Sequence, residues 1–222
     1  MTNILPFYIK DCALATIATG LKARTLMEFR EKLSAIDPAC VYYHFWSPRL
    51  RPSFEHWLYL NDFSQWFRKS LHDDVLAERV DVLDPTDYVN MEDLRDDLLK
   101  IVDHRLHENE ALASYQSAEE FYFAKSKIII FQTRLRFSQP AELVHIVPLL
   151  TLSSLFFHFI DARRRTSDKI DDFSSWLKDS FGDEYQDLIS MLRKKDPYII
   201  SLSDLKIKLI KMITQYFVKD NA

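Results

Sequence analysis

Two short segments of the sequence each place one histidine five and seven residues ahead of two arginines. The first segment holds His44, Arg49 and Arg51, and the second holds His158, Arg163 and Arg165. Guanidinium groups offer paired donors that match a phosphate or a carboxylate, and an imidazole can add a third contact. The spacing therefore predicts an anion clamp in each segment.

The first segment is also surrounded by aromatic and polar residues. They are Tyr43, Trp46, His56, Trp57, Asn61 and Asp62. Aromatic faces with polar edges suit a sugar or a base. An alternative interpretation makes each histidine a hydrogen-bonded core residue and each arginine a favourable charge at a helix C-terminus. In both cases we expect Asp62 and Asp172 to cap the helices that follow them.

Metal, cofactor and catalytic chemistry have weaker support. Glu142 and His145 have the spacing of helical di-iron ligands, and His104 lies three residues before His107 near Asp97 and Asp103, but neither set is complete. The chain has only two glycines, Gly20 and Gly182, which excludes a P-loop and a dinucleotide fingerprint. We expect no metal and no cofactor, and we assign no catalytic residue.

The two histidine segments belong to a longer internal repeat. An offset of 114 aligns Phe7-Tyr8 with Phe121-Tyr122, and Thr19 with Thr133. After a short deletion the offset is 110, which aligns Asp62-Phe63-Ser64-x-Trp66 with Asp172-Phe173-Ser174-x-Trp176. The order of these landmarks predicts a tandem duplication.

Apolar residues recur at helical spacing within each copy. Leu26, Phe29, Leu33 and Ile36 form one stripe, and Met91, Leu94, Leu98 and Ile101 form another. The scarcity of glycine also disfavours tight β-turns. We predict an all-α fold of two pseudo-symmetric helical modules with four to six short helices each. The weakest point is Lys127–Phe131, whose β-branched residues are compatible with a short strand.

The polar segment between the copies predicts the division of the chain. We expect a first helical module at 1–106, a linker at 107–118 and a diverged second module at 119–222. Trp66 and Trp176 lie on apolar stripes, so we expect both in the core.

The first copy resembles a small bacterial family of unknown function. The resemblance rests on motifs that cover most of residues 7–106: Phe7-Tyr8, Thr19-Gly-Leu-Lys-Ala23, Tyr42-Tyr43-His44, Asn61-Asp62-Phe63 with Trp66, Leu76-Ala-Glu-Arg79, Asp84-Pro85 and Asp93-Leu94-Arg95. The second copy departs from this pattern, with Phe156-Phe157-His158 and Thr133-Arg-Leu135. The resemblance implies no activity.

Charge and hydropathy limit the partners. A net charge of −4 and a pI near 6.0 disfavour nucleic-acid binding. The most apolar stretch, 146–160, is too short for a membrane span. We predict a cytoplasmic, non-enzymatic binding or regulatory protein that uses the aromatic, arginine and histidine surface of the first copy to recognise a protein partner. The alternative is a binding protein or an enzyme for a small anionic ligand, such as a sugar phosphate or a nucleotide, with His44, Arg49 and Arg51 as the clamp.

Overall fold

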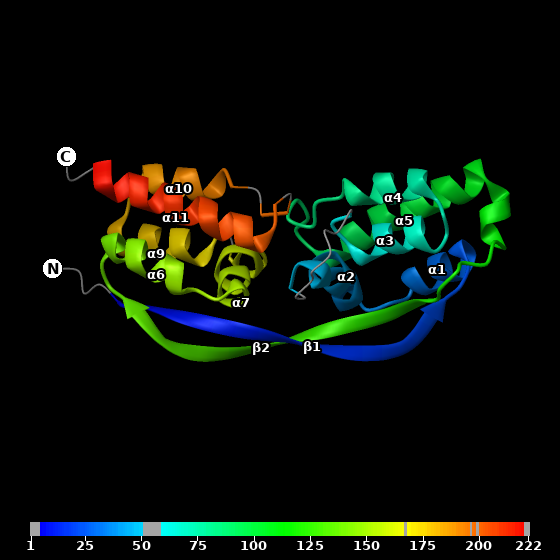
Figure 1. Ribbon diagram of the computed structural model, residues 1–222, viewed down its shortest axis with the longest axis horizontal. Helices are drawn as coiled ribbons and strands as arrows, with labels where there is room; N and C mark the ends of the chain where they lie inside the picture. The colour runs from blue at the N-terminus through cyan, green and yellow to red at the C-terminus, as the bar shows by residue number, and fades with distance from the viewer. Residues whose placement is uncertain (1–4, 51–58, 167, 196, 199, 220–222) are drawn as a thin grey trace. The chain divides into compact units, whose positions relative to one another are not determined.

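A computed structural model describes residues 5–50, 59–166, 168–195, 197–198 and 200–219 of the chain. It shows two long antiparallel strands in addition to the expected helices (Figure 1). Strand β1 spans Phe7–Ala23 and strand β2 spans Phe121–Phe137. The prediction of an all-α fold is therefore wrong.

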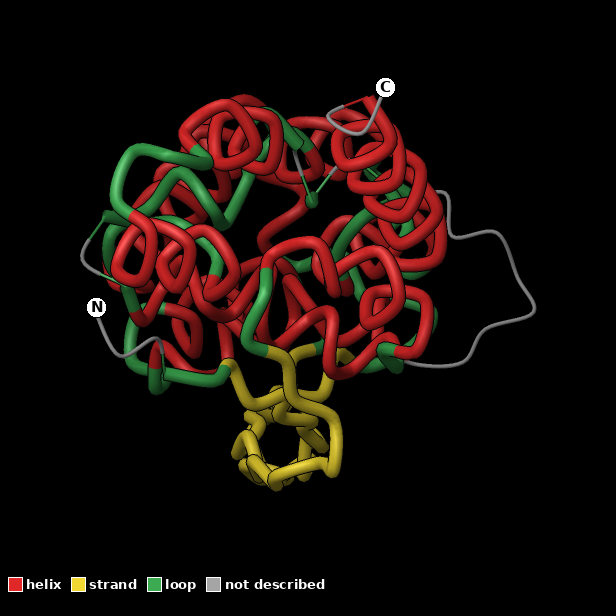
Figure 2. Tube along the Cα trace, turned by 90° about the vertical axis from the view of Figure 1, so that its left-hand side faces the viewer, coloured by secondary structure: helices red, strands yellow, loops and turns green. Residues whose placement is uncertain are grey.

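The start of each strand shows the period of two that a half-buried strand requires. In β1, Phe7 and Ile9 are buried while Tyr8 is exposed, and in β2 Phe121 and Phe123 are buried while Tyr122 is exposed. Tight turns are unnecessary because the chain between the strands is helical. The low glycine content therefore does not exclude this sheet. Figure 2 shows the two strands coiling around one another, as the twist of a two-stranded ribbon allows.

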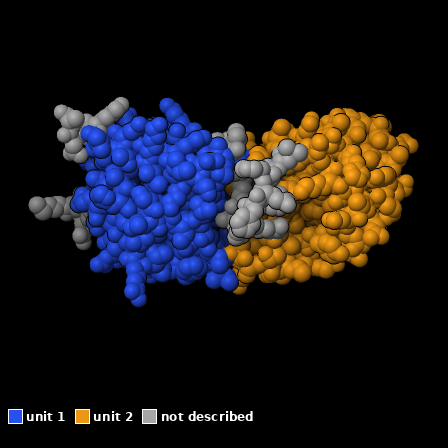
Figure 3. Space-filling model, viewed as in Figure 1, with its two compact units in different colours: residues 1–13, 128–222 blue, residues 14–127 orange. Residues whose placement is uncertain are grey.

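The chain divides into two compact units, coloured separately in Figure 3. Unit 1 consists of residues 1–13 and 128–222, and unit 2 consists of residues 14–127. Each strand contributes to both units, because the divisions fall inside β1 and β2. The segment 107–118, expected to be a linker, belongs to unit 2 and includes a short 3₁₀ helix at Glu110–Ala113.

Unit 2 contains the helices of the first sequence copy. They are α1 (Leu26–Leu33), α2 (Pro38–Leu50), α3 (Asp62–Lys69), α4 (Asp74–Asp81) and α5 (Met91–Glu108). Helix α5 contacts α1, α2 and α4, and α3 contacts α2 and α4. The buried residues of the predicted stripes, including Phe29, Leu33 and Leu98, form the core between these helices.

Unit 1 contains the helices of the second copy. They are η2 (Pro140–Glu142), α6 (Leu143–Ile146), η3 (Val147–Leu149), α7 (Leu152–Leu155), the π-helical turn η4 (Phe156–Asp161), α8 (Ala162–Arg165), α9 (Asp172–Phe181), α10 (Gln186–Arg193) and α11 (Leu202–Lys219). Helix α11 contacts α6, α7 and α10, and α9 contacts α10 and η4. No helix in the described part of the chain is long and apolar enough to cross a membrane.

In each unit an equivalent threonine hydrogen bond joins the two strands to one another. The Thr19 hydroxyl donates to the carbonyl of Phe123 (2.6 Å), and the Thr133 hydroxyl donates to the carbonyl of Ile9 (2.8 Å). These four residues follow the offset of 114. Ring contacts place the strands on the helices: in unit 2 Phe121, at the start of β2, contacts helices of the first copy, and in unit 1 Phe7, at the start of β1, contacts α9 of the second.

The indole groups provide a second pair of equivalent contacts. Trp66 Nε1 donates to the carbonyl of Glu119 (2.8 Å), and Trp176 Nε1 donates to the carbonyl of Leu5 (2.9 Å). Both tryptophans are almost entirely buried, so their expected place in the core is confirmed. Each therefore contributes both to the apolar core and to anchoring a strand.

Candidate functional site

His158 lies in unit 1, inside the π-helical turn η4, where its side chain is buried. Its Nε2 accepts a hydrogen bond from the backbone N–H of Lys10 (2.8 Å). Its Nδ1 lies 2.8 Å from Oδ2 of Asp172 in the first turn of α9. Because Nε2 is an acceptor, the ring proton belongs on Nδ1, where it is donated to the carboxylate. The imidazole thus joins strand β1 to helix α9.

Arg165 is held beside this pair by carboxylates and a carbonyl. Its guanidinium donates to Asp161 (2.9 Å), to Asp172 (3.0 Å) and to the backbone oxygen of Phe157 (2.9 Å), and it stacks over the Phe157 ring at 4.1 Å. Partial burial opposes the charge of Arg165, but the attraction of Asp172 and Asp161 outweighs it and raises the pKa of the guanidinium. The Arg165 guanidinium therefore stays charged and is held in one position at the site.

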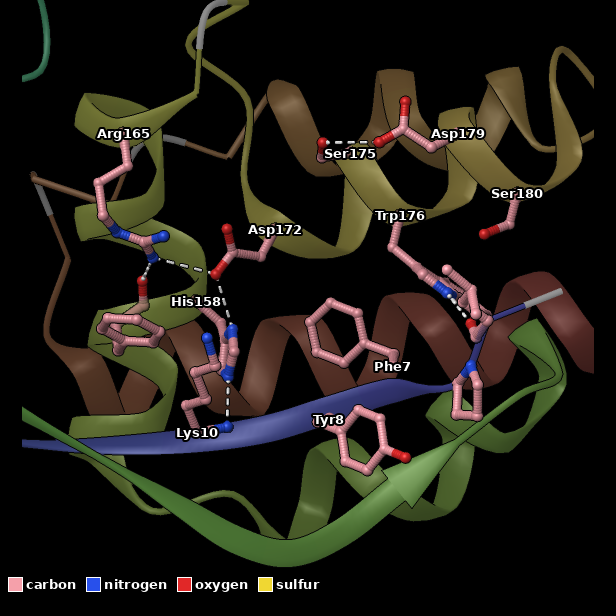
Figure 4. A pocket seen from close by; sticks show the side chains of 13 residues that line it. Phe7, Tyr8, Lys10, His158, Arg165, Asp172, Ser175, Trp176, Asp179 and Ser180 are labelled. Atoms are coloured by element: carbon pink, nitrogen blue, oxygen red, sulfur yellow. Dashed lines mark hydrogen bonds and ion pairs between the residues drawn. The ribbon is translucent and has the colours of Figure 1, made fainter.

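A pocket of about 520 Å³ opens next to this network, entirely within unit 1 (Figure 4). Its walls come from the start of β1, from the η4 and α8 turns and from α9. The lining residues are Leu5, Pro6, Phe7, Tyr8, Lys10, Phe157, His158, Arg165, Asp172, Ser175, Trp176, Asp179 and Ser180. A pocket of this size, with aromatic walls and a few polar groups, is typical of a small-molecule site.

The structure brings together two of the three cationic candidates of the second segment. His158 and Arg165 both line the pocket. Arg163 lies elsewhere: it donates to the backbone oxygen of Lys195 (3.1 Å) and its guanidinium lies 5.0 Å from the centre of the Phe159 ring. The pair of arginines expected to act together is therefore divided between two places in unit 1.

The first segment has the same histidine arrangement in unit 2. His44 Nε2 accepts from the backbone N–H of Ala124 (3.0 Å), and Nδ1 lies 2.9 Å from Asp62 Oδ2. The Ser47 hydroxyl also donates to that oxygen (2.7 Å). Both histidines are thus buried and bonded through both ring nitrogens, which agrees with the interpretation that makes them hydrogen-bonded core residues.

The remaining candidates of the first segment fall into two groups. Tyr43 and Trp46 are buried, with exposed fractions of 5% and 2%, and Tyr43 lies near the ring of His44. Neither can present its face to a partner. Arg51, His56 and Trp57 lie outside the described residues, as does the side chain of Arg49, so their part in a binding surface stays a prediction.

The expected helix caps are displaced by one residue. Asn61, which is completely buried, caps α3 by accepting from the N–H of Ser64 (2.8 Å), and Asp171 caps α9 by accepting from the N–H of Ser174 (2.9 Å). The prediction that Asp62 and Asp172 are the caps is wrong. Each is the first residue inside its helix, which points its carboxylate at the histidine instead.

The residues with metal-like spacing serve other purposes. Glu142 accepts from the backbone N–H groups of Ser138 and Gln139, and these hydrogen bonds lower its pKa. His104 pairs with Glu108 on the surface of α5. In the described ranges of the chain, no group of three His, Cys, Asp or Glu side chains is arranged to hold a metal ion.

Several pocket residues were not among the sequence candidates. Tyr8 and Lys10 lie on β1, and Ser175, Asp179 and Ser180 lie on α9. The alternation Phe7-Tyr8-Ile9-Lys10 is the signal that could have placed Lys10 on the outer face of a strand. Nothing in the sequence brings β1 beside α9, because 148 residues lie between the end of β1 at Ala23 and the start of α9 at Asp172.

The fold and site can now be compared with known proteins. A family model for a family of unknown function (DUF5752) matches residues 4–214, so the chain belongs to that family. A solved structure, described as the structure of OrfY from Thermoproteus tenax, matches with a TM-score of 0.80 and 26% identity, covering 95% of each chain. No curated protein matches the sequence.

Proposed function

We propose that this protein is a cytoplasmic, non-enzymatic binding or regulatory protein that holds a small ligand in the unit 1 pocket. The observation that supports the proposal is the pocket itself, in which aromatic side chains, two serines and charged groups converge within one compact unit. The histidine there serves the fold, because both of its ring nitrogens are engaged. Ligand binding would change the affinity of this protein for a protein partner.

A thermal-shift panel tests the binding step. The wild-type chain is heated with sugars, sugar phosphates, nucleotides and simple anions. A ligand present at about 100 times its Kd, and bound only by the folded state, adds about 2.7 kcal/mol. For a chain of this size that corresponds to a rise in Tm of roughly 5–10 °C.

Two substitutions locate the binding site. Ser175→Tyr places a bulky ring in the pocket from α9 and is expected to abolish the ligand-dependent rise in Tm. Ser203→Tyr makes the same change on the exposed surface of α11 and is expected to leave the rise intact. If Ser175→Tyr retains the full response, the ligand binds elsewhere. If no compound changes the wild-type Tm, the proposal fails.

A further inference from the structure

Lys10 differs from Arg165, the other cation of the pocket, because no carboxylate of the described residues forms an ion pair with its side chain. Arg165 already binds two carboxylates and a carbonyl. Lys10 holds β1 to His158 through its backbone N–H, whereas its side chain extends toward the pocket (Figure 4). No carboxylate in the described part of the chain forms an ion pair with the Lys10 ammonium, which is therefore available for a ligand.

The pocket charges explain which kind of group Lys10 would take. The carboxylate of Asp172 is occupied by His158 and by Arg165 at its Oδ2 oxygen. Arg165 and Asp161 pair nearby, and the Asp179 carboxylate lies on α9, away from Lys10, where it accepts from the Ser175 hydroxyl (3.4 Å). An incoming anion could therefore pair with the Lys10 ammonium without breaking the hydrogen bonds among His158, Arg165 and Asp172.

The equivalent position in unit 2 has no such charge. An offset of 114 places Ala124 where unit 1 has Lys10, and the backbone N–H of Ala124 makes the same hydrogen bond to His44. The backbone contact is thus served equally well by an alanine. The lysine side chain is therefore not required for fastening the strand.

The other residues that line the pocket suit the ring of a sugar. Tyr8 contributes an aromatic ring that is 41% exposed, and Trp176 lies farther along the pocket. Ser175, Asp179 and Ser180 come from α9, with hydroxyl and carboxylate oxygens that can accept from or donate to sugar hydroxyls. Aromatic faces beside such groups favour a hydroxyl-bearing ring over an extended apolar molecule.

We propose that the pocket binds a sugar carrying one anionic group, phosphate or carboxylate, with that group on the Lys10 ammonium and the ring between Tyr8 and the polar side chains of α9. This inference rests on the proposed function, because it names the ligand class of the same pocket.

Isothermal titration calorimetry of the full chain tests the inference with four probes: a neutral hexose, its 6-phosphate, the matching uronic acid and inorganic phosphate. The phosphate ester and the uronic acid are expected to bind at least tenfold more tightly than the neutral hexose. Inorganic phosphate alone is expected to bind more weakly than the ester, because it lacks the ring. A charge-assisted hydrogen bond supports a difference of roughly 10- to 100-fold.

Three variants assign the charge. Lys10→Ala is expected to weaken the anionic sugars roughly 10- to 100-fold while leaving the neutral hexose unchanged, and Lys10→Arg is expected to retain most of the affinity. Lys127→Ala removes an exposed lysine from the ribbon in unit 2 and is the matched control. All three keep the backbone N–H, so the contact with His158 is preserved.

The outcomes separate this inference from the proposed function. If a neutral sugar binds as tightly as its phosphate, or Lys10→Ala binds the anionic sugars normally, the assignment of the charge is overturned while the pocket remains a binding site. If none of the four probes binds but another compound of the thermal panel does so in a Ser175-dependent way, the ligand class is wrong and the proposed function stands. If nothing binds, both are overturned.

Discussion

His158 accepts a hydrogen bond from the backbone of Lys10, 148 residues earlier in the chain, and His44 accepts one from the backbone of Ala124. In each unit a buried imidazole thus joins a helix to a strand from the distant part of the chain. The second ring nitrogen of each histidine is taken up by an aspartate. Within each aromatic core, the histidine therefore joins a strand and a helix through hydrogen bonds.

Replacing either histidine should destabilise the protein. His158→Ala leaves the backbone N–H of Lys10 without its acceptor and the Asp172 carboxylate with Arg165 as its remaining partner, so we expect a loss of about 2–4 kcal/mol in the free energy of unfolding. His44→Ala should cost a similar amount. Urea denaturation measures both, with His107→Ala on the exposed end of α5 as a control expected to stay within about 0.5 kcal/mol. A change that small for His158→Ala would contradict the structural role.

The phenylalanine at the start of β2 should matter more for stability than the one in its middle. Phe121 contacts the rings of Phe29, His44, Phe63 and Trp66. Phe121→Ala is expected to cost about 3–5 kcal/mol by opening a cavity. Phe131, which is 48% exposed on the same strand, should tolerate alanine with little loss. Equal losses for the two variants in chemical denaturation would refute this placement of the core.

The two helix caps allow a reciprocal exchange. Asp171 is fully buried, and desolvation raises the pKa of its carboxyl above the ordinary value of 3.8, although the Ser174 hydrogen bonds oppose this. The folded state therefore holds this proton more tightly than the unfolded state. The contribution to stability is present below pH 3.8 and is lost as the pH rises through the raised pKa.

Asp171→Asn should remove that pH dependence. The variant is expected to gain stability relative to the wild type as the pH rises from 3.5 to 7, because Asn61 shows that an amide can cap the equivalent helix. The reverse change, Asn61→Asp, should introduce the same dependence and destabilise unit 2 at pH 7. Denaturation curves at several pH values measure both. Parallel pH profiles for Asp171→Asn and the wild type would disprove the explanation.

The two halves of the chain should assemble into a folded complex when they are made as separate fragments. If the polypeptide is made as residues 1–114 and 115–222, we expect the fragments to copurify, because each supplies a strand segment to the core of the other's helices. Size-exclusion chromatography should show one complex. Phe7→Ala in the first fragment is expected to weaken that complex. Two separately folded, monomeric fragments would contradict the exchange of strands.

Both cysteines should resist modification in the folded state. Burial, with help from the nearby carboxylate of Asp11, raises the pKa of the Cys12 thiol to about 12, and burial also raises the pKa of Cys40. Because the thiolate is the reactive form, a thiol reagent at pH 8 is expected to react slowly with the native chain. In denaturant the same reagent is expected to react rapidly with both cysteines. Rapid reaction of one equivalent without denaturant would show an accessible thiol.

The sequence repeat predicted which residues share an environment, but it did not predict what surrounds them. The offset of 114 pairs His44 with His158 and Thr19 with Thr133, and the structure gives each pair equivalent contacts. Helical periodicity likewise placed Phe29 and Leu98 in the core. These features could be predicted because they depend on local spacing.

The strands and the pocket depend on contacts between distant segments. Glycine content was a misleading guide, since β1 and β2 are joined by helices instead of a hairpin turn. Asp172 could not be assigned to His158 because its direction depends on whether it is the cap of α9 or the residue after it. The place of Lys10 follows only when β1 is seen against helices of the second copy.

The division of each strand between the units also has a consequence for biosynthesis. Unit 2 is a continuous segment, 14–127, and can be completed as soon as the start of β2 has left the ribosome. Residues 7–13 are made before unit 2, yet they belong to a unit whose remaining part, 128–222, is made after it. At roughly 5–20 residues per second, residues 7–13 wait roughly 10–40 seconds until all the helices of their unit have been made. During that interval the Phe7 and Ile9 side chains lack the core that covers them in the finished protein.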